Sequence, residues 1–232
     1  MTTHQSLAKG NVVIVDTGCA NITSVFCAFE RLGADVSISA DVNVIRAASK
    51  VVIPGVGTAV QAMANINAKG LLAVLQQLTQ PTLGICLGMQ LMTELSLENP
   101  TLADSASSLL ANHHTDNNDA LVPCLGVIPG LVEPLASNGL RLPHMGWNTL
   151  KKKREHAILA GITDTDYVYF VHSFAVKPSS HTLASCEYGT EFSAIIGKAN
   201  FIGMQFHPER SGAVGRQLLA NFLAATPEEL WV

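Results

Sequence analysis

The segment Gly84-Ile85-Cys86-Leu87-Gly88 constrains the fold of this chain more than any other. It joins the apolar run 81–85, which is typical of a strand, to the stretch 87–97, which we interpret as a helix, and Cys86 lies between the two. Glycines two positions before and two positions after a cysteine are typical of a nucleophile elbow. In such an elbow a strand turns sharply into a helix, and the strained turn leaves no room for a Cβ at either glycine. The motif therefore requires a strand that passes directly into a helix.

Short β-branched runs alternate with helical patterns through the first half of the chain. Strands are expected at 12–15, 36–39, 51–53 and 81–85, and helices at 22–32, 59–65, 70–78 and 87–97. The second half is richer in strands, which we expect at 142–150, 167–173, 182–188, 192–197 and 201–205, before a last helix with apolar positions between 214 and 222. We predict one α/β domain over 1–232, with an open, mostly parallel sheet, helices on both faces and extra antiparallel strands in the second half.

Two segments do not follow this pattern. Residues 1–10 precede the first strand and are expected to form a flexible extension. Residues 98–120 contain several Ser, Asn and Asp residues without helical or strand periodicity, so we interpret them as a mobile loop insertion.

Charge and cysteine usage exclude several classes of protein. The net charge is -4 and charged residues make up only 14% of the chain, which argues against nucleic acid or an anionic membrane as a ligand. No apolar stretch is long enough to span a membrane, and the first residues lack the apolar core of a signal peptide, so we expect a cytoplasmic protein. The five cysteines are scattered and odd in number, which argues against a disulfide framework or a zinc site.

A cysteine nucleophile needs a base, and the segment Gln205-Phe206-His207-Pro208-Glu209 offers one. We interpret Cys86 as the nucleophile, because the following helix N-terminus favours its thiolate form. His207 is the candidate base, kept extended by Pro208. His207 and Glu209 are expected to lie two residues apart in one extended segment, where both side chains can point to the same side, so Glu209 could accept the imidazole N–H. Cys86, His207 and Glu209 thus form a plausible catalytic triad.

The turn Pro54-Gly55-Val56-Gly57 follows a predicted strand and could donate backbone N–H groups. A carbonyl attacked by Cys86 would need two donors for its oxyanion, and the N–H of Leu87 is the natural first one. The N–H of Val56 or of Gly57 could be the second, although an ordinary tight turn explains this segment equally well. A phosphate cradle is less favoured because the chain lacks the G-x-x-x-x-G-K-[ST] motif. Gln90, one helical turn after Cys86, can border the nucleophile.

The chain resembles the class I (triad-type) glutamine amidotransferases through GICLGMQL at 84–91 and GMQFHPERSG at 203–212. Within them it is most similar to the glutaminase subunits of imidazole glycerol phosphate synthases, through HMGWN at 144–148 and YFVHSF at 169–174. This resemblance implies a flavodoxin-like fold and hydrolysis of L-glutamine by Cys86, His207 and Glu209 through a thioester. It also implies delivery of the ammonia to a β/α-barrel cyclase partner in histidine biosynthesis.

The resemblance further implies roles for single residues. Gly57, Gln90 and Ser173 would border bound glutamine, and Trp147 and Arg210 would lie at the surface that meets the cyclase subunit in a heterodimer. No metal and no cofactor are implied.

Two other classes of function stay open at this point. The chain could be a non-catalytic interaction subunit, although such a subunit has no need of Cys86, His207 and Glu209 together. It could also be a hydrolase that acts alone, such as a cysteine peptidase or a glutamyl hydrolase. Met-Gly-Trp-Asn at 145–148 and the lack of a signal peptide favour the amidotransferase.

Overall fold

The structure is a computed structural model that describes residues 10–18, 22–98 and 121–232. Its centre is an eight-stranded sheet with the order β2-β1-β3-β4-β14-β13-β12-β9. The strands are β1 (Asn11–Val15), β2 (Asp35–Ser39), β3 (Lys50–Gly55), β4 (Thr82–Cys86), β14 (Phe201–Met204), β13 (Thr190–Lys198), β12 (Thr182–Tyr188) and β9 (Lys151–Lys152). The strands from β2 to β14 in this order are parallel to their neighbours, and β13, β12 and β9 continue the sheet in antiparallel pairs. This confirms the predicted mostly parallel sheet with antiparallel strands from the second half of the chain.

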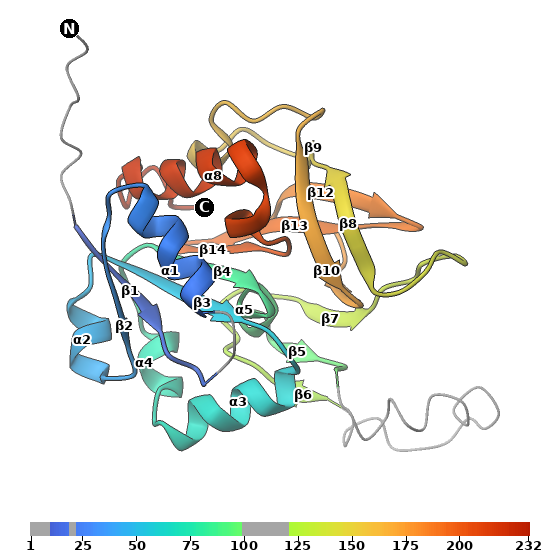
Figure 1. The fold of residues 1–232 in the computed structure, drawn as a ribbon. Coiled ribbons are helices and arrows are strands. Elements are labelled where there is room, and N and C mark those ends of the chain that lie inside the picture. The colour runs from blue at the N-terminus through green and yellow to red at the C-terminus, as the bar shows by residue number, and fades with distance from the viewer. Residues whose placement is uncertain (1–9, 19–21, 99–120) are drawn as a thin grey trace, which may run out of the picture.

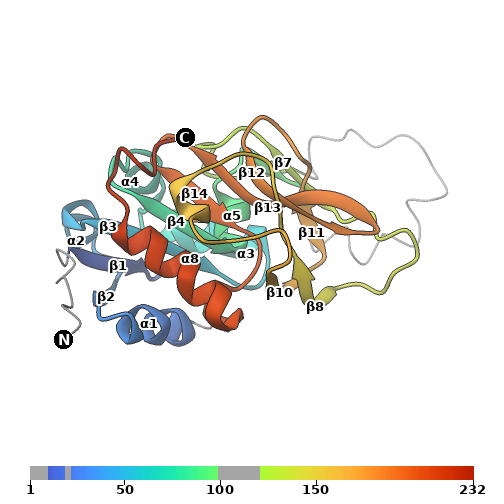
Figure 2. The ribbon, with the colours of Figure 1, turned by 90° about the horizontal axis from the view of Figure 1, so that it is seen from above.

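Helices cover both faces of the sheet, as Figures 1 and 2 show. They are α1 (Ile22–Arg31), α2 (Val42–Ala47), α3 (Ala59–Ala68), α4 (Leu72–Gln76), α5 (Leu87–Leu91) and α8 (Gly212–Ala224), with short 3₁₀ helices η2 (Ala157–Leu159) and η3 (Pro208–Arg210). Side chains alternate between the two faces of a strand. Accordingly Val12 and Ile14 of β1 pack with the residues of α1 and α8, whereas Val13 and Val15 pack with those of α2, α3 and α4. Strands buried in this way must be apolar at every position, and β1 is apolar from Val12 to Val15.

Two smaller sheets extend the molecule beyond the large one. The strands β8 (His144–Thr149) and β10 (Tyr167–His172) form an antiparallel pair. A second small sheet has the order β11-β7-β5-β6 and contains β11 (Phe174–Val176), β7 (Leu131–Pro134), β5 (Leu95–Ser96) and β6 (Val122–Pro123). In Figure 1 the β8–β10 pair stands beside the large sheet, and the chain passes from β10 directly into β11.

The helix predicted over 87–97 is wrong beyond its first turns, because α5 ends at Leu91. The backbone N–H of Leu125 donates to the carbonyl of Leu91, and the N–H groups of Val127 and Ile128 donate to that of Met92. These carbonyls would otherwise accept bonds from the next helical turn, so a distant segment ends the helix. No pattern in the sequence predicts α2, β7 or β11. The predictions for 1–10 and 98–120 lie outside the described residues, apart from Gly10 and Glu98.

Candidate active site

Three parallel strands end side by side at one edge of the large sheet, and the candidate residues follow from their ends. Gly55 at the end of β3 pairs with Cys86 at the end of β4, and Met204 at the end of β14 pairs with Ile85. The turn with Val56 and Gly57, the elbow and the His207 segment therefore start from neighbouring positions. Open α/β sheets place ligands at the carboxyl ends of their strands, and this edge is such a place.

The elbow has the strained geometry that its sequence predicts. Cys86 has φ 54° and ψ −112°, a left-handed conformation that residues with a Cβ rarely adopt. A Cβ on Gly84 would lie 2.7 Å from the carbonyl oxygen of Gly88, and a Cβ on Gly88 would overlap the carbonyl oxygen of Ile53. Strand β3 and the start of α5 thus touch backbone to backbone, which fixes the height of Cys86 above the sheet.

His207 and Glu209 form a buried pair beside the elbow. Nδ1 of His207 lies 2.9 Å from Oε1 of Glu209, whose side chain is only 1% exposed. His207 is extended, with φ −98° and ψ 93°, as expected before a proline, but Glu209 lies in the 3₁₀ helix η3. The expectation that both residues share an extended segment is therefore wrong. The tight turn at Pro208 brings the carboxylate back toward the imidazole.

The charge state of His207 depends on its two partners. Burial disfavours the imidazolium, but hydrogen bonds to Cys86 and Glu209, together with the negative charges of these two groups, outweigh it and raise the pKa of His207 to about 10. The backbone is held as well, because the N–H of His207 donates to the carbonyl of Tyr169 and the hydroxyl of Ser211 donates to the carbonyl of His207. The site therefore favours a charged imidazolium in a fixed position.

A cavity of about 190 Å³ opens in front of Cys86. Its lining includes seven of the residues that the sequence singles out: Val56, Gly57, Cys86, Leu87, Gln90, Ser173 and His207. Val171, His172, Phe174 and Glu98 complete the lining. The structure therefore brings together, around one small cavity, residues from four distant parts of the sequence, while Glu209 lies behind His207.

Two histidines support one wall of this cavity. Nδ1 of His172 lies 2.9 Å from the carbonyl oxygen of Phe174, which can only accept, so this nitrogen carries the proton. Nε2 of His172 must then accept from Nδ1 of His144 at 3.0 Å. The ring of His144 stacks between those of Phe170 and Tyr188, with centroids 4.8 and 4.1 Å away. Burial lowers the pKa of His144 to about 4 and that of His172 to about 3, so both are neutral near pH 7.

Sequence reasoning missed two polar residues at the site. Glu98 lines the cavity, and its Oε2 accepts a hydrogen bond from the N–H of Ala59 at the start of α3. Burial raises the pKa of this carboxyl group. Gln205 is fully buried and lies behind Cys86 and Gln90. Glu98 stands in a predicted loop and Gln205 at a predicted strand end, and no local pattern distinguishes either residue.

The two predicted interface residues lie outside the cavity. Trp147 is 54% exposed on β8 and meets Tyr169 of β10 edge to face, with ring centroids 5.8 Å apart. Arg210 is exposed in η3, next to Glu209. Both residues therefore lie on the surface around the candidate site.

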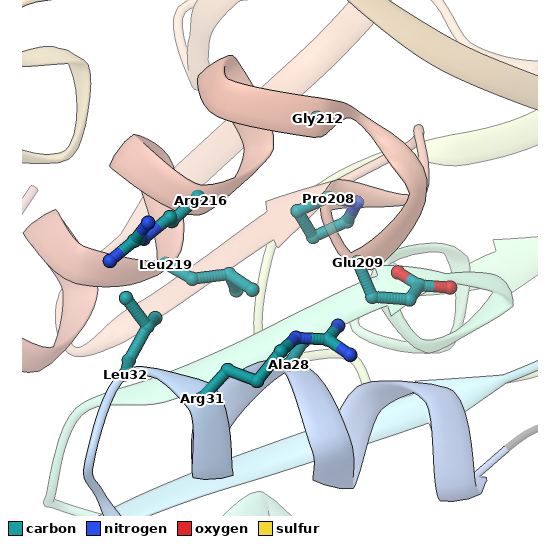
Figure 3. Close-up of a pocket in the computed structure, with 8 residues that line it drawn as sticks. All are labelled: Ala28, Arg31, Leu32, Pro208, Glu209, Gly212, Arg216 and Leu219. Carbon is teal, nitrogen blue, oxygen red and sulfur yellow. The ribbon is translucent and has the colours of Figure 1, made fainter.

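A second cavity of about 400 Å³ lies between α1 and α8, on the other side of Glu209 (Figure 3). Arg31, Arg216 and Glu209 line it, and Oε2 of Glu209 is buried without a hydrogen-bond partner among the described residues. The close-up shows the Arg31 side chain extending toward Glu209. One oxygen of the carboxylate thus lies on His207, and the other has no hydrogen-bond partner among the described residues.

Within residues 10–18, 22–98 and 121–232, no group of three or more His, Cys, Asp or Glu side chains could hold a metal ion. None of the helices in this part of the chain is long and apolar enough to cross a membrane.

Known proteins resemble this chain over nearly its whole length. Residues 13–226 match the family "Glutamine amidotransferase class-I". The protein "Imidazole glycerol phosphate synthase subunit HisH" of Colwellia psychrerythraea is 56% identical, over 94% of this chain and 94% of its own, and that of Shewanella sediminis is 50% identical, over 94% and 92%. The structure of PurLQS from Thermotoga maritima shares the fold, with a TM-score of 0.62 at 17% identity over 93% of this chain and 98% of the other. This chain therefore belongs to the class I glutamine amidotransferases, in the family of the imidazole glycerol phosphate synthase subunits HisH.

Proposed function

We propose that this chain is the glutaminase subunit of an imidazole glycerol phosphate synthase, a single glutamine amidotransferase domain that works in the cytoplasm with a β/α-barrel cyclase subunit. It hydrolyses L-glutamine and passes the ammonia to that partner. One observation carries the proposal: the strained Cys86 is hydrogen-bonded to the buried His207, which Glu209 holds from behind, and both line one cavity with the other predicted glutamine residues. The relatives' name, imidazole glycerol phosphate synthase subunit, supports the choice of partner.

The reaction follows from this arrangement in two halves. The Cys86 thiolate attacks the side-chain amide carbon of glutamine, and the imidazolium of His207 gives its proton to the amide nitrogen, which leaves as ammonia. A thioester to glutamate remains. His207 then takes a proton from water, the hydroxide attacks the thioester, and the Cys86 thiolate leaves beside the imidazolium. The starting ion pair is thereby restored, and the released acid gives up its proton to become glutamate. The Glu209 carboxylate stabilises the imidazolium in both halves.

Each tetrahedral intermediate carries a negative oxygen that needs donors in place. The N–H of Leu87 lies directly after the nucleophile, and Val56 and Gly57 line the same cavity from the end of β3. We assign the oxyanion to these backbone groups. Gly57 has φ +94°, a conformation that favours glycine and sets the direction of the turn.

The remaining lining residues suit the amino-acid end of glutamine. Nε2 of Gln90 already donates to the carbonyl of Phe174 and to Gln205, so its oxygen is the atom proposed to meet the substrate. The carboxylate of Glu98 can bind the α-ammonium group of glutamine. The positive charge of that group would offset the cost of burying the Glu98 carboxylate. Ser173 completes this part of the cavity.

The proposal is tested with Cys86→Ala in the complex with the cyclase from the same organism. We expect glutamine-dependent activity to fall about 10⁴-fold or more, because the thioester route is lost. Activity supplied by free ammonia should persist, since the cyclase site is untouched. Cys186→Ala, which alters a buried cysteine of the core, is the control and should retain both activities. A Cys86→Ala complex that kept more than a tenth of the glutamine-dependent rate would refute the assignment.

A further inference from the structure

Gln205 lies at the centre of a buried network of hydrogen bonds behind Cys86, and the proposed mechanism gives it no direct role. Its side chain is 0% exposed and does not line the glutamine cavity. It follows β14 and reaches back to the elbow, where Nε2 lies 3.9 Å from Sγ of Cys86, within reach of the larger sulfur atom. Its Oε1 accepts from Nε2 of Gln90 at 3.0 Å.

One atom determines which groups donate and which accept along this series of hydrogen bonds. The carbonyl oxygen of Phe174 can only accept, so the group of Gln90 that lies 3.0 Å from it must be the NH₂ group. The same NH₂ group then donates to Gln205, which must present its oxygen. The NH₂ group of Gln205 is left to face the sulfur. Rotating either amide by 180° would bring like groups together inside the protein, where an unmade hydrogen bond is costly.

The sulfur is thus surrounded by groups of three different kinds. The carbonyl oxygen of Val171 lies 3.8 Å away and suits an S–H donor, so it favours the neutral thiol. The titratable partner of Cys86 is His207, whose imidazolium favours the thiolate by its charge, and Glu98 lines the same cavity. The amide of Gln205 is a neutral donor, so it favours the thiolate at every pH.

We propose that Gln205 is a positioning residue of the glutaminase reaction, which donates a hydrogen bond to the Cys86 thiolate and holds Gln90 toward the substrate. This inference rests on Cys86 being the nucleophile. The side-chain amide of Gln205 then has two effects, one from its NH₂ group and one from its oxygen, and these can be measured separately. The NH₂ end acts on the reactivity of sulfur, and the oxygen end acts on glutamine binding through Gln90.

The first test is the rate of Cys86 alkylation by iodoacetamide as a function of pH, in the full-length chain, with the labelled site identified by mass spectrometry. Gln205→Met has similar length and no donor. We expect the pH at which the rate is half-maximal to rise by about one unit, as the loss of a hydrogen bond to a charged group implies. Asn200→Leu removes another buried amide, one that donates to the carbonyls of Leu78 and Gln80, and should leave the profile unchanged.

The second test separates the two ends by steady-state kinetics in the complex with the cyclase. Gln205→Glu keeps an oxygen that can accept from Gln90 but turns an acceptor toward the sulfur. It should lower kcat about tenfold or more with a smaller change in KM, and it should raise the half-maximal pH of alkylation at least as much as Gln205→Met. Gln205→Met should change both kcat and KM, because Gln90 loses its partner too.

The outcomes distinguish this inference from the proposed function. If Cys86 of the parent chain is no more reactive than Cys27, the proposed function fails. If Cys86 of the parent chain is reactive and both folded Gln205 variants give the parental alkylation profile, the inference is overturned, and Gln205 has only a structural role in packing. If Gln205→Met does not fold, the isosteric Gln205→Glu variant decides by the same measurement.

Discussion

The imidazole of His207 is held from two sides, and each contact favours its charged form. The Glu209 carboxylate lies 2.9 Å from Nδ1, and Cys86 is hydrogen-bonded to the same ring. The pKa of His207 is raised, so the imidazolium persists well above pH 7 and loses its proton only as the pH approaches about 10. In the proposed reaction, His207 is therefore charged and able to protonate the leaving nitrogen throughout the physiological range.

Glu209→Gln tests this arrangement, because it keeps the size of the side chain and removes its charge. We expect kcat/KM for glutamine in the complex to fall about 10³-fold or more, as for the loss of the charge in other triads. Glu209 helps to raise the pKa of His207, so the alkaline limb of the pH–rate profile should also move to lower pH. Glu191→Gln, which alters a surface ion pair with Lys153, is the control. A variant within tenfold of the parent and with an unmoved alkaline limb would reduce Glu209 to a packing role.

Residues in short motifs could be found from the sequence, and residues that act through distant contacts could not. Cys86 and His207 are marked by glycines and by a proline that shape their own backbone. Gln205 is separated from Gln90 by 115 positions, and Glu98 from Ala59 by 39. The surroundings of these two residues exist only after the sheet has formed, so no local sequence pattern predicts their roles. The same holds for the neutral pair of His144 and His172.

The β8–β10 pair is an element whose interior depends on uncharged histidines. In the unfolded chain a histidine titrates near pH 6.5, whereas His144 and His172 titrate at about 4 and about 3 when folded. Below pH 6.5 the unfolded chain therefore binds protons that the folded chain does not. Their contribution to stability is present above about 6.5 and is lost as the pH falls toward 4. The raised pKa of His207 gives a slope of the opposite sign near pH 6.5, and His207 adds little slope below about pH 5.5, where it is protonated in both states.

We predict that urea unfolding measured between pH 6.5 and pH 4.5 shows this loss, with up to about 1.4 kcal/mol per pH unit from each buried histidine. His144→Phe keeps a ring between Phe170 and Tyr188 and cannot titrate. Its stability at pH 7 should be lower than that of the parent, because Nε2 of His172 loses its donor, but its slope with pH should be shallower by about that amount. His181→Gln serves as the control at a partly exposed histidine. An equal slope in the parent and in His144→Phe would show that His144 is charged in the fold.

At the scale of elements, the sequence predicts the longer strands, β8 and β10 of the separate pair included, and fails for short segments that form only against partners from elsewhere in the chain. Strand β12 is found at 182–188, where the sequence predicts a strand. The helix predicted after Cys86 extends to 97, but backbone donors from 125–128 end it at Leu91. Strand β5 has two residues and forms only because β6 and β7 lie beside it. Such short strands carry no periodicity of their own.

In the whole molecule, the parallel strands of the large sheet position the candidate catalytic residues, and the antiparallel β8–β10 pair forms the cavity wall and an exposed surface. The C-terminal ends of the parallel strands β3, β4 and β14 bring together the proposed oxyanion turn, the proposed nucleophile and the proposed base. The β8–β10 pair supplies one wall of the cavity through Val171 and His172, and carries Met145 and Trp147, which are 62% and 54% exposed, on its surface. A partner that covers these apolar side chains would lie next to the cavity wall. The low share of charged residues in the sequence is consistent with a covered face of this kind.

The last prediction concerns this surface. Trp147→Ala should weaken binding of the cyclase subunit, with Kd rising about 30-fold or more, since large aromatic anchors dominate interface energies. Calorimetric titration of the variant with the cyclase would measure this, and unchanged alkylation of Cys86 in the isolated variant would show that the site is intact. Trp231→Ala is the matched control: Trp231 is 60% exposed, but it precedes Val232, which pairs with Ala199 at the opposite end of β14 from His207. Equal affinities of the two variants would place the cyclase elsewhere on the molecule.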